Sequence, residues 1–281
     1  MKIKQKLAIQ YIRAKFKVLA MVSTRKAAEK AFELFCTPLE KSKKPAPAVF
    51  SLAEKLKYTL NGHTIKGYCW NKGQTKKVLI LHGFSSSSYN FQGYILPLVE
   101  KGYEVLAFDA PAHGNSGGKT INVVQYREMI ELLIKEHGPI DSFIAHSFGG
   151  IAVCLAMEKT VHDLHTKIVL IAPATETVSA IDAAFSMLQI KKQAIRQEFD
   201  SIIIERSGHM PKWFSIRRAM NHIKAKVLWI HDEGDTVTPL KDALKVRDNK
   251  HSNLEFVITS GLGHRNIYRS SSVKKKIFEF L

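Results

Sequence analysis

Beyond about residue 76 the hydrophobic positions form short continuous runs, separated by longer stretches with helical periodicity. Uninterrupted apolar runs of this length are typical of parallel strands covered on both faces of a sheet. The six expected strands are Val78–Leu81, Val105–Phe108, Phe143–Ala145, Ile168–Ile171, Val227–Ile230 and Phe256–Ile258. Helices are expected between them, for example over Val123–Glu136 and Gly150–Lys159. The alternation predicts an α/β fold with a doubly wound, mostly parallel sheet, and functional groups at the carboxyl ends of its strands.

Two segments depart from this alternation. The pair Asn61-Gly62 lies between the strand-like segments Lys55–Leu60 and Thr64–Trp70. Because Asn and Gly both tolerate positive φ, this pattern predicts an antiparallel hairpin. The stretch of about fifty residues between Pro173 and Ile223 is rich in helix formers and too long for a simple crossover. We therefore expect the main domain to span 49–281, with a helical cap inserted at about 174–223.

Residues 1–48 are predicted to form a separate part, a basic amphipathic helix followed by a linker. The apolar positions expected to share one stripe of this helix are Leu7, Ile9, Tyr11, Ile12, Phe16, Val18, Leu19 and Val22. The basic, Pro-rich segment Lys41–Ala48 is the expected linker. A helix of this kind either packs on the rest of the protein or lies on a membrane surface as a peripheral contact, and the pattern leaves both open.

Composition narrows the class of protein. The net charge is +17, and residues 1–44 contribute +9 of it, with twelve Lys or Arg against three Glu. No nucleic-acid motif accompanies this charge, so we expect a solvated basic surface and no nucleic-acid binding. No apolar run approaches the roughly 20 residues that a membrane-spanning helix needs. The three cysteines are widely spaced, and their number and spacing do not indicate a set of disulfide pairs. This favours a reducing, cytoplasmic location.

The segment from Ala145 to Gly150 (Ala-His-Ser-Phe-Gly-Gly) follows one expected strand and opens an expected helix. Small residues on both sides of Ser147 are needed where a sharp strand–turn–helix brings two backbones close together. Ala145 stands where glycine is usual, which is a mild departure. The alternative interpretation is a serine that caps a helix.

A nucleophilic serine also needs donors for the oxyanion that forms on the attacked carbonyl. Leu81-His82-Gly83-Phe84 directly follows an early strand. A sharp strand–turn–helix that carries a nucleophilic serine is called a nucleophile elbow. In this arrangement the two donors are the backbone N–H of the residue after the serine and a backbone N–H from the loop after an early strand. These are Phe148 and Phe84.

Serine is a weak nucleophile near neutral pH, so it needs a base, and the base needs an orienting acid. Asp235 lies in the segment 231–239 after the strand Val227–Ile230, and His264 follows the last strand within Gly-Leu-Gly-His. The order Ser147, Asp235, His264 is the one expected for this architecture. Asp232 is the alternative candidate for the orienting acid, but it stands at the start of the loop, whereas Asp235 lies deeper in it.

From about residue 50 onward the chain resembles the α/β-hydrolase family, the esterase/lipase-like group with a helical cap. The resemblance rests on the elbow, on His82-Gly83, on Asp109–Ser116, on the acid segment 231–239 and on His264. It implies cleavage of a carboxylic ester or thioester of a small molecule through an acyl-enzyme, with neither metal nor organic cofactor. Asp109 and His113 are interpreted as structural.

Other functions remain open at this stage. Members of the family that use an aspartate nucleophile are disfavoured by Ser147. An acyltransferase, a carbon–carbon bond hydrolase or a cofactor-free perhydrolase would share the same triad. A non-catalytic binding protein on the same fold is the alternative from another class. It is disfavoured because nucleophile, base and acid are all retained.

Overall fold

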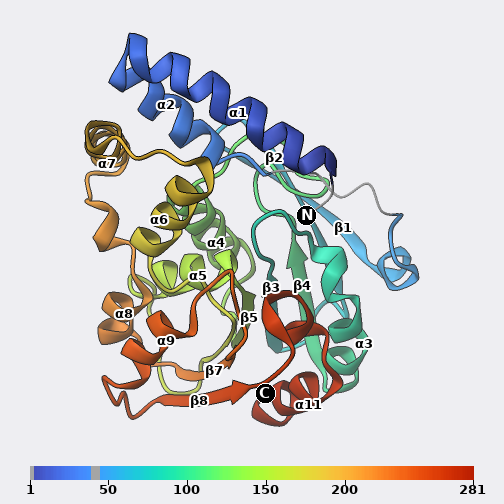
Figure 1. Ribbon diagram of the computed structural model, residues 1–281. Helices are drawn as coiled ribbons and strands as arrows, with labels where there is room; N and C mark the ends of the chain where they lie inside the picture. Colours follow the sequence, from blue (N-terminus) through green and yellow to red (C-terminus); the bar gives the residue numbers. More distant parts are fainter. Residues whose placement is uncertain (1–2, 39–44) are drawn as a thin grey trace. The chain divides into compact units, whose positions relative to one another are not determined.

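The computed structural model describes residues 3–38 and 45–281, and the chain divides into two compact units. We call Pro38–Thr175 with Ser215–Leu281 the sheet unit, and Met1–Thr37 with Glu176–Phe214 the helical unit. The predicted linker overlaps 39–44, which lie outside the described residues. Figure 1 shows the order of the elements along the chain.

The sheet unit contains one eight-stranded sheet in the order β1-β2-β4-β3-β5-β6-β7-β8. Its strands are β1 (Glu54–Leu60), β2 (His63–Trp70), β3 (Lys76–Leu81), β4 (Tyr103–Phe108), β5 (Ser142–His146), β6 (Lys167–Ile171), β7 (Lys226–Asp232) and β8 (Leu254–Thr259). Strand β2 pairs antiparallel with β1 and β4, and all later pairs are parallel. All six predicted strands and the Asn61-Gly62 hairpin are confirmed.

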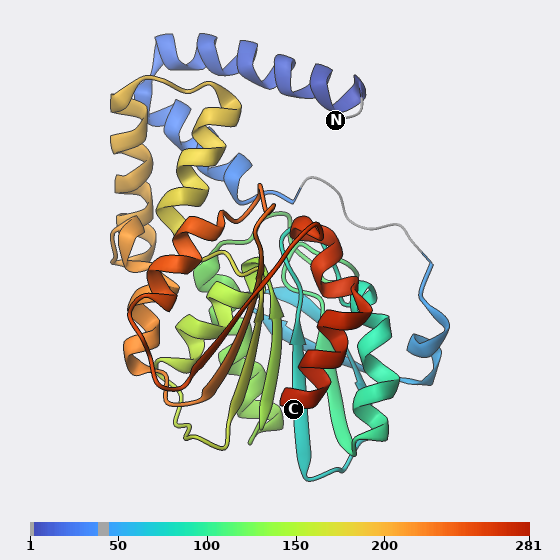
Figure 2. The same cartoon turned by 60° about the horizontal axis from the view of Figure 1, so that its bottom comes forward.

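Helices cover both faces of this sheet (Figure 2). They are α3 (Gln92–Glu100), α4 (Val123–His137), α5 (Phe148–Met157), α8 (Ile216–Ala219), α9 (Leu240–Arg247), α10 (Gly263–Asn266) and α11 (Ser271–Phe280). Helices α3 and α11 pack together on one face, and α4, α5, α8 and α9 follow one another on the other. The chain therefore has the predicted doubly wound architecture.

The burial of each strand follows its place in the sheet. Central β4 is buried at all six positions, whereas the edge strands β1 and β8 alternate between exposed and partly buried residues. A strand covered on both faces has no polar side, which is why the apolar runs in the sequence located the central strands well. Burying each Leu, Ile or Val there contributes about 1.5–3 kcal/mol.

The helical unit combines α1 (Ile3–Val22) and α2 (Thr24–Phe35) with α6 (Thr177–Leu188) and α7 (Gln193–Ser207). Phe199 of α7 is its centre, with ring contacts to Phe32, Phe35 and Phe185 at 5.1–5.8 Å. Arg25 of α2 pairs with Glu205 of α7. The N-terminal helices and the insertion, expected as separate parts, thus pack into one unit, and residues 215–223 belong to the sheet unit instead.

The expected single stripe on α1 is wrong. Phe16 is 5% exposed, but Val18 and Val22 are 59% and 74% exposed. Each residue advances a helix by about 100°, so positions 18 and 22 lie on the side opposite Phe16. Among the described residues, no helix is long and apolar enough to cross a membrane.

Candidate active site

Ser147 occupies the sharp turn between β5 and α5. Its backbone has φ 54° and ψ −116°, a conformation that costs energy for any residue with a side chain. Strand β6 and the segment after it hold it there: Ser147 N–H donates to Ile171 O at 3.1 Å, and Ala174 N–H donates to Ser147 O at 2.9 Å. A Cβ atom at Gly149 would lie 2.8 Å from Leu81 O, so this position must be glycine. The turn therefore matches the predicted nucleophile elbow.

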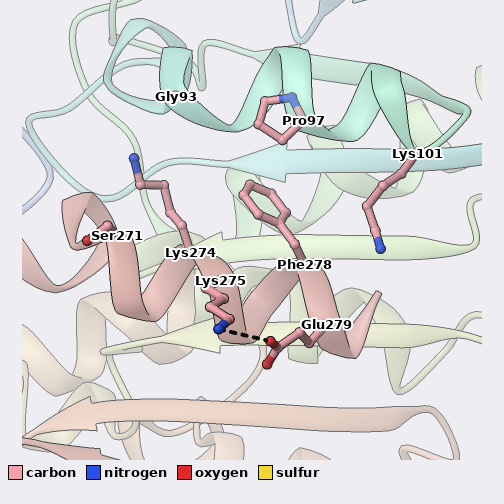
Figure 3. A pocket seen from close by; sticks show the side chains of 8 residues that line it. All are labelled: Gly93, Pro97, Lys101, Ser271, Lys274, Lys275, Phe278 and Glu279. Atoms are coloured by element: carbon pink, nitrogen blue, oxygen red, sulfur yellow. Dashed lines mark ion pairs between the residues drawn. The ribbon is translucent and has the colours of Figure 1, made fainter.

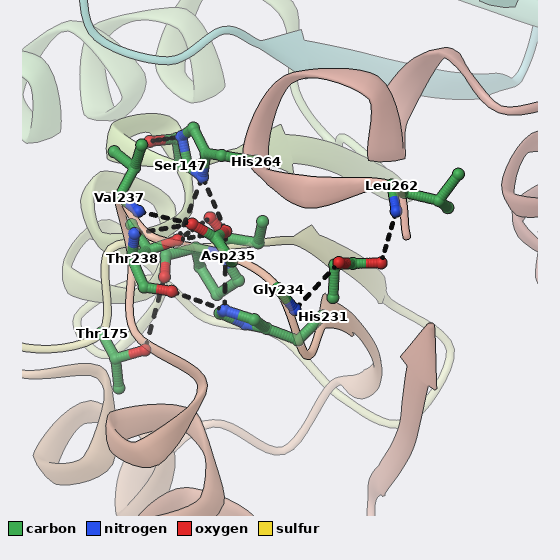
Figure 4. Close-up of polar contacts among 12 residues, drawn as sticks. Ser147, Thr175, His231, Gly234, Asp235, Val237, Thr238, Leu262 and His264 are labelled. Atoms are coloured by element: carbon green, nitrogen blue, oxygen red, sulfur yellow. Dashed lines mark hydrogen bonds and ion pairs between the residues drawn. The ribbon is translucent and has the colours of Figure 1, made fainter. Parts of the chain in front are cut away.

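The structure brings Ser147, Asp235 and His264 together, from the segments that follow β5, β7 and β8 (Figure 4). Ser147 Oγ lies 3.0 Å from His264 Nε2, and His264 Nδ1 lies 2.8 Å from Asp235 Oδ2. Because a carboxylate only accepts, the Nδ1–H donates to Asp235, which leaves the Nε2 lone pair facing the serine hydroxyl. This geometry allows His264 to take a proton from Ser147.

Asp235 is held by more than the histidine. Its Oδ1 accepts hydrogen bonds from the backbone N–H groups of Val237 and Thr238, at 2.8 and 2.9 Å. The Thr238 hydroxyl donates to Oδ2 at 2.8 Å. Burial alone would raise the pKa of Asp235, but the hydrogen bonds and charge of His264, together with Thr238, lower this pKa to about 2. The carboxylate therefore stays ionised throughout the neutral range.

The rival acid, Asp232, performs a different task. Its carboxylate accepts from Gly234 N–H at 3.0 Å, from the Thr259 hydroxyl at 2.8 Å and from Leu262 N–H at 3.0 Å. These bonds connect the loop after β7 to the end of β8 and to the segment that leads to His264. Asp232 thus supports the backbone around the site, and none of its hydrogen bonds is to the His264 ring.

The loop after β3 passes beside Ser147, since a Cβ atom at Gly83 would lie 2.9 Å from Ser147 Cβ. The peptide between Gly83 and Phe84 is fixed by His82, whose Nδ1–H donates to Gly83 O at 2.8 Å. The other ring nitrogen of His82 accepts from Ala110 N–H at 2.9 Å. Burial keeps this imidazole neutral by lowering its pKa to about 4.

The following peptide is fixed by a second histidine. Ser85 N–H donates to His113 Nε2 at 2.9 Å, and His113 Nδ1–H donates to Pro111 O at 2.9 Å. Phe84 therefore lies between two anchored peptide groups. Its ring meets the Phe148 ring edge-to-face at 5.7 Å, so the two residues expected to donate to an oxyanion are neighbours.

The segment 109–116 is hydrogen-bonded to the loop after β3 and supports it. Asp109 is fully buried, and its Oδ1 accepts from both the backbone N–H and the hydroxyl of Ser88. Its Oδ2 accepts from Asn115 N–H at 2.8 Å. Gly114 has φ 44° and passes so close to Asp109 that a Cβ atom would collide with the carboxylate. Asp109 connects two loops and does not contact the triad.

Three residues near the triad were not predicted from the sequence. The Thr238 hydroxyl also lies 3.1 Å from His264 Nδ1. His231 donates from Nε2 to Thr238 O at 2.8 Å, and His146 donates from Nε2 to His264 O at 3.0 Å. The sequence feature that could have pointed to Thr238 is its position three residues after Asp235. An aspartate often accepts a hydrogen bond from a backbone N–H two or three residues later in a turn.

An open groove of about 460 Å³ lies elsewhere, between α3 and α11 (Figure 3). Pro97 and Phe278 line it, with lysines at its rim, and none of the triad residues takes part. Within residues 3–38 and 45–281, no cluster of three or more His, Cys, Asp or Glu side chains is arranged to hold a metal ion.

Residues 78–247 match the family model described as the alpha/beta hydrolase family. The match covers more than half of the chain, and it spans the elbow and the acid loop. The chain therefore belongs to the α/β-hydrolase family.

Individual relatives are distant. The esterase Pf2001 of Pyrococcus furiosus has a similar fold, with a TM-score of 0.64 and 23% identity over 87% of this chain and 98% of that one. "Putative esterase/lipase 2" of Mycoplasma pneumoniae is 22% identical over 222 residues, 68% of this chain and 82% of its own. "Uncharacterized hydrolase YugF" of Bacillus subtilis is 27% identical over 120 residues, 41% of this chain. That match spans 43% of the YugF chain.

Proposed function

We propose that this chain is a serine hydrolase that cleaves a carboxylic ester or thioester through an acyl-enzyme. The observation that carries the proposal is the hydrogen-bonded series from Ser147 Oγ to His264 Nε2 at 3.0 Å and from His264 Nδ1 to Asp235 Oδ2 at 2.8 Å. The family and the names of the relatives, which include esterase and lipase, support the same class of reaction.

In the first half-reaction Ser147 Oγ attacks the carbonyl carbon while His264 Nε2 takes its proton. Asp235 keeps the imidazole in the tautomer that accepts this proton and stabilises the imidazolium that forms. The tetrahedral oxyanion is bound by the backbone N–H groups of Phe84 and Phe148. His264 then gives its proton to the leaving alcohol or thiol, and the acyl group stays on Ser147.

In the second half-reaction His264 takes a proton from a water molecule, which attacks the acyl carbonyl through the same oxyanion site. The proton returns to Ser147 Oγ as the acid leaves. His82 and His113 serve both steps indirectly, because they fix the peptide groups on either side of Phe84. Fixed donors cost no reorganisation when charge develops on the oxygen.

A p-nitrophenyl ester series of increasing acyl length tests the proposal, with Ser147→Ala as the comparison. We expect the native chain to hydrolyse some members and the variant to be inactive, and the length profile then measures the acyl site. Turnover by the variant that equals the native rate would contradict the role of Ser147. A native protein that binds the esters without hydrolysing them would favour a binding protein, and acyl transfer to an added alcohol would favour an acyltransferase.

A further inference from the structure

The described side chains of helix α1 include two apolar sides, and of these one packs within the helical unit. Phe16 is buried within the helical unit, where α1 contacts α2 and α6. The opposite side carries Val18, Met21 and Val22, which are 59%, 79% and 74% exposed. Their spacing of three and four residues places them next to one another on one helical face. Large apolar side chains adjacent on a surface mark an interaction site more often than single ones do.

The charge of α1 has one sign. The segment Ile3–Val22 contains five Lys or Arg and no Asp or Glu. Farther along the unit, Arg25 is neutralised by Glu29 and Glu205, and Arg196 by Asp182 and Asp200. The unbalanced positive charge of the unit is therefore concentrated on the helix that also exposes the apolar face.

We propose that the outward face of α1, formed by Val18, Met21 and Val22, docks on an anionic lipid surface. An interfacial helix combines an apolar face that enters the acyl boundary with Lys and Arg that attract anionic headgroups. Both parts are present on α1. The inference is independent of the hydrolase chemistry, because no residue of the triad or of its supporting loops takes part.

Two other occupants fit this face less well. A nucleic acid would use the positive charge but would leave the three apolar side chains without a partner. A second copy of the chain, paired through the same face, would bring two helices with five positive charges each into contact. Like charges across an isologous contact disfavour association. Of these three occupants, the anionic membrane satisfies both the charge and the apolar surface.

The test is co-sedimentation of the full chain with vesicles of phosphatidylcholine alone and with about 30% phosphatidylserine. We expect binding to the anionic vesicles only, at about 0.1 M salt, and release as the salt is raised toward about 1 M, because screening shortens the reach of the charges. The triple variant Val18→Ser, Met21→Ser, Val22→Ser should bind at least about tenfold more weakly, since it loses the apolar area that enters the membrane.

The matched control is the double variant Val161→Ser, Leu164→Ser, which removes two exposed apolar side chains from the sheet unit. It should bind like the native chain, and ester hydrolysis in solution should be unchanged in both variants. Equal binding to neutral and anionic vesicles, or a triple variant that binds as well as the native chain, would overturn the proposal. A native dimer that the triple variant converts to a monomer, without vesicle binding, would overturn it in favour of self-association.

Discussion

The two loops that flank Ser147 are both held by side-chain hydrogen bonds to backbone, but through different acceptors. In the acid loop, residues 231–239, the Asp235 carboxylate accepts from the N–H groups of Val237 and Thr238. In the oxyanion loop, residues 82–88, the acceptors of backbone N–H groups include neutral imidazoles: His113 accepts from Ser85 and His82 from Ala110. Asp109 adds a carboxylate to the oxyanion loop, since it accepts from Ser88 N–H. The difference is that Asp235 alone accepts these N–H groups of the acid loop, whereas the oxyanion loop divides such contacts between a carboxylate and imidazoles.

This difference sets how each loop responds to acid. A carboxylate whose pKa is about 2 keeps accepting hydrogen bonds far below neutral pH. An imidazole that accepts a backbone N–H loses that role when it is protonated, and the pKa of His82 is about 4. Among these contacts, the hydrogen bond from Ala110 N–H to His82 is therefore more sensitive to acid than the bonds to Asp235. The two loops also contact different residues: Asp235 of the acid loop bonds to the His264 ring, and His82 and His113 hold the peptide groups on either side of Phe84.

The largest expected effect concerns the two aspartates of the acid loop. Asp235→Asn should lower kcat about 10³- to 10⁴-fold, because an amide no longer fixes the tautomer of His264. Asp232→Asn is the matched control and should cost less than about tenfold, since Asp232 bonds to Gly234, Thr259 and Leu262 but not to the His264 ring. Steady-state kinetics on a p-nitrophenyl ester measure both. A fall in Asp232→Asn that equals the fall in Asp235→Asn would contradict the assignment.

The next effect belongs to the oxyanion loop. His113→Leu removes the acceptor of Ser85 N–H and should lower kcat about 10- to 100-fold with little change in KM, because a displaced donor mainly affects the transition state. His113→Gln keeps an oxygen acceptor and should retain more activity. Circular dichroism checks that both variants fold. A native kcat in folded His113→Leu would show that this histidine does not position Phe84.

A smaller effect is expected at Thr238. Its hydroxyl donates to Asp235 Oδ2 at 2.8 Å and lies 3.1 Å from His264 Nδ1. Thr238→Val keeps the shape but removes a hydrogen bond to a charged group, so kcat should fall about tenfold. Thr236→Val, at an exposed position of the same loop, should leave kcat unchanged. Equal activity of the two variants would remove Thr238 from the positioning network.

The smallest effect is on stability, and its pH range separates the buried imidazoles His82 and His146 from the carboxylate of Asp235. Burial lowers the pKa of His82 to about 4 and that of His146 to about 3, below the unfolded value near 6.5. The unfolded chain therefore binds more protons at acidic pH, and stability that is complete above about pH 6.5 is lost as the pH falls toward 4. The Asp235 contribution, present above about pH 4, is lost only as the pH falls through about 2. Urea midpoints measured from pH 7 to 4.5 should decrease steadily, and a flat profile would contradict buried neutral imidazoles.

Much of the site was predictable because short sequence segments specify it. The elbow, the His82-Gly83 pair and the end of β7 each lie within a few residues of a buried strand, and apolar runs locate such strands well. His264 follows the edge strand β8, which the short apolar segment Phe256–Ile258 still located. Ala145 did not disturb this prediction, since the position two residues before Ser147 needs a small residue and alanine is one. The order of Ser147, Asp235 and His264 is the one expected for this architecture, and the structure brings the three side chains together.

What the sequence left out depends on contacts between distant segments. His146 supports His264, 118 positions away, through a backbone hydrogen bond that no local pattern signals. Helices α2 and α7 pack together although more than 150 residues separate them, so the single helical unit could not be recognised from the chain order. The sequence prediction placed the apolar positions of α1 on one stripe, because apolar positions alone do not show which face of a helix is buried.

Covalent labelling of the nucleophile tests the central claim most directly. The native chain would be treated with a phosphonate ester that reacts with activated serines, and then analysed by intact mass and peptide mapping, with Ser147→Ala and Asp235→Asn in parallel. We predict one adduct per chain on Ser147, none in Ser147→Ala, and much slower labelling of Asp235→Asn. An adduct on another residue, or a native chain that stays unlabelled while it hydrolyses esters, would contradict the account.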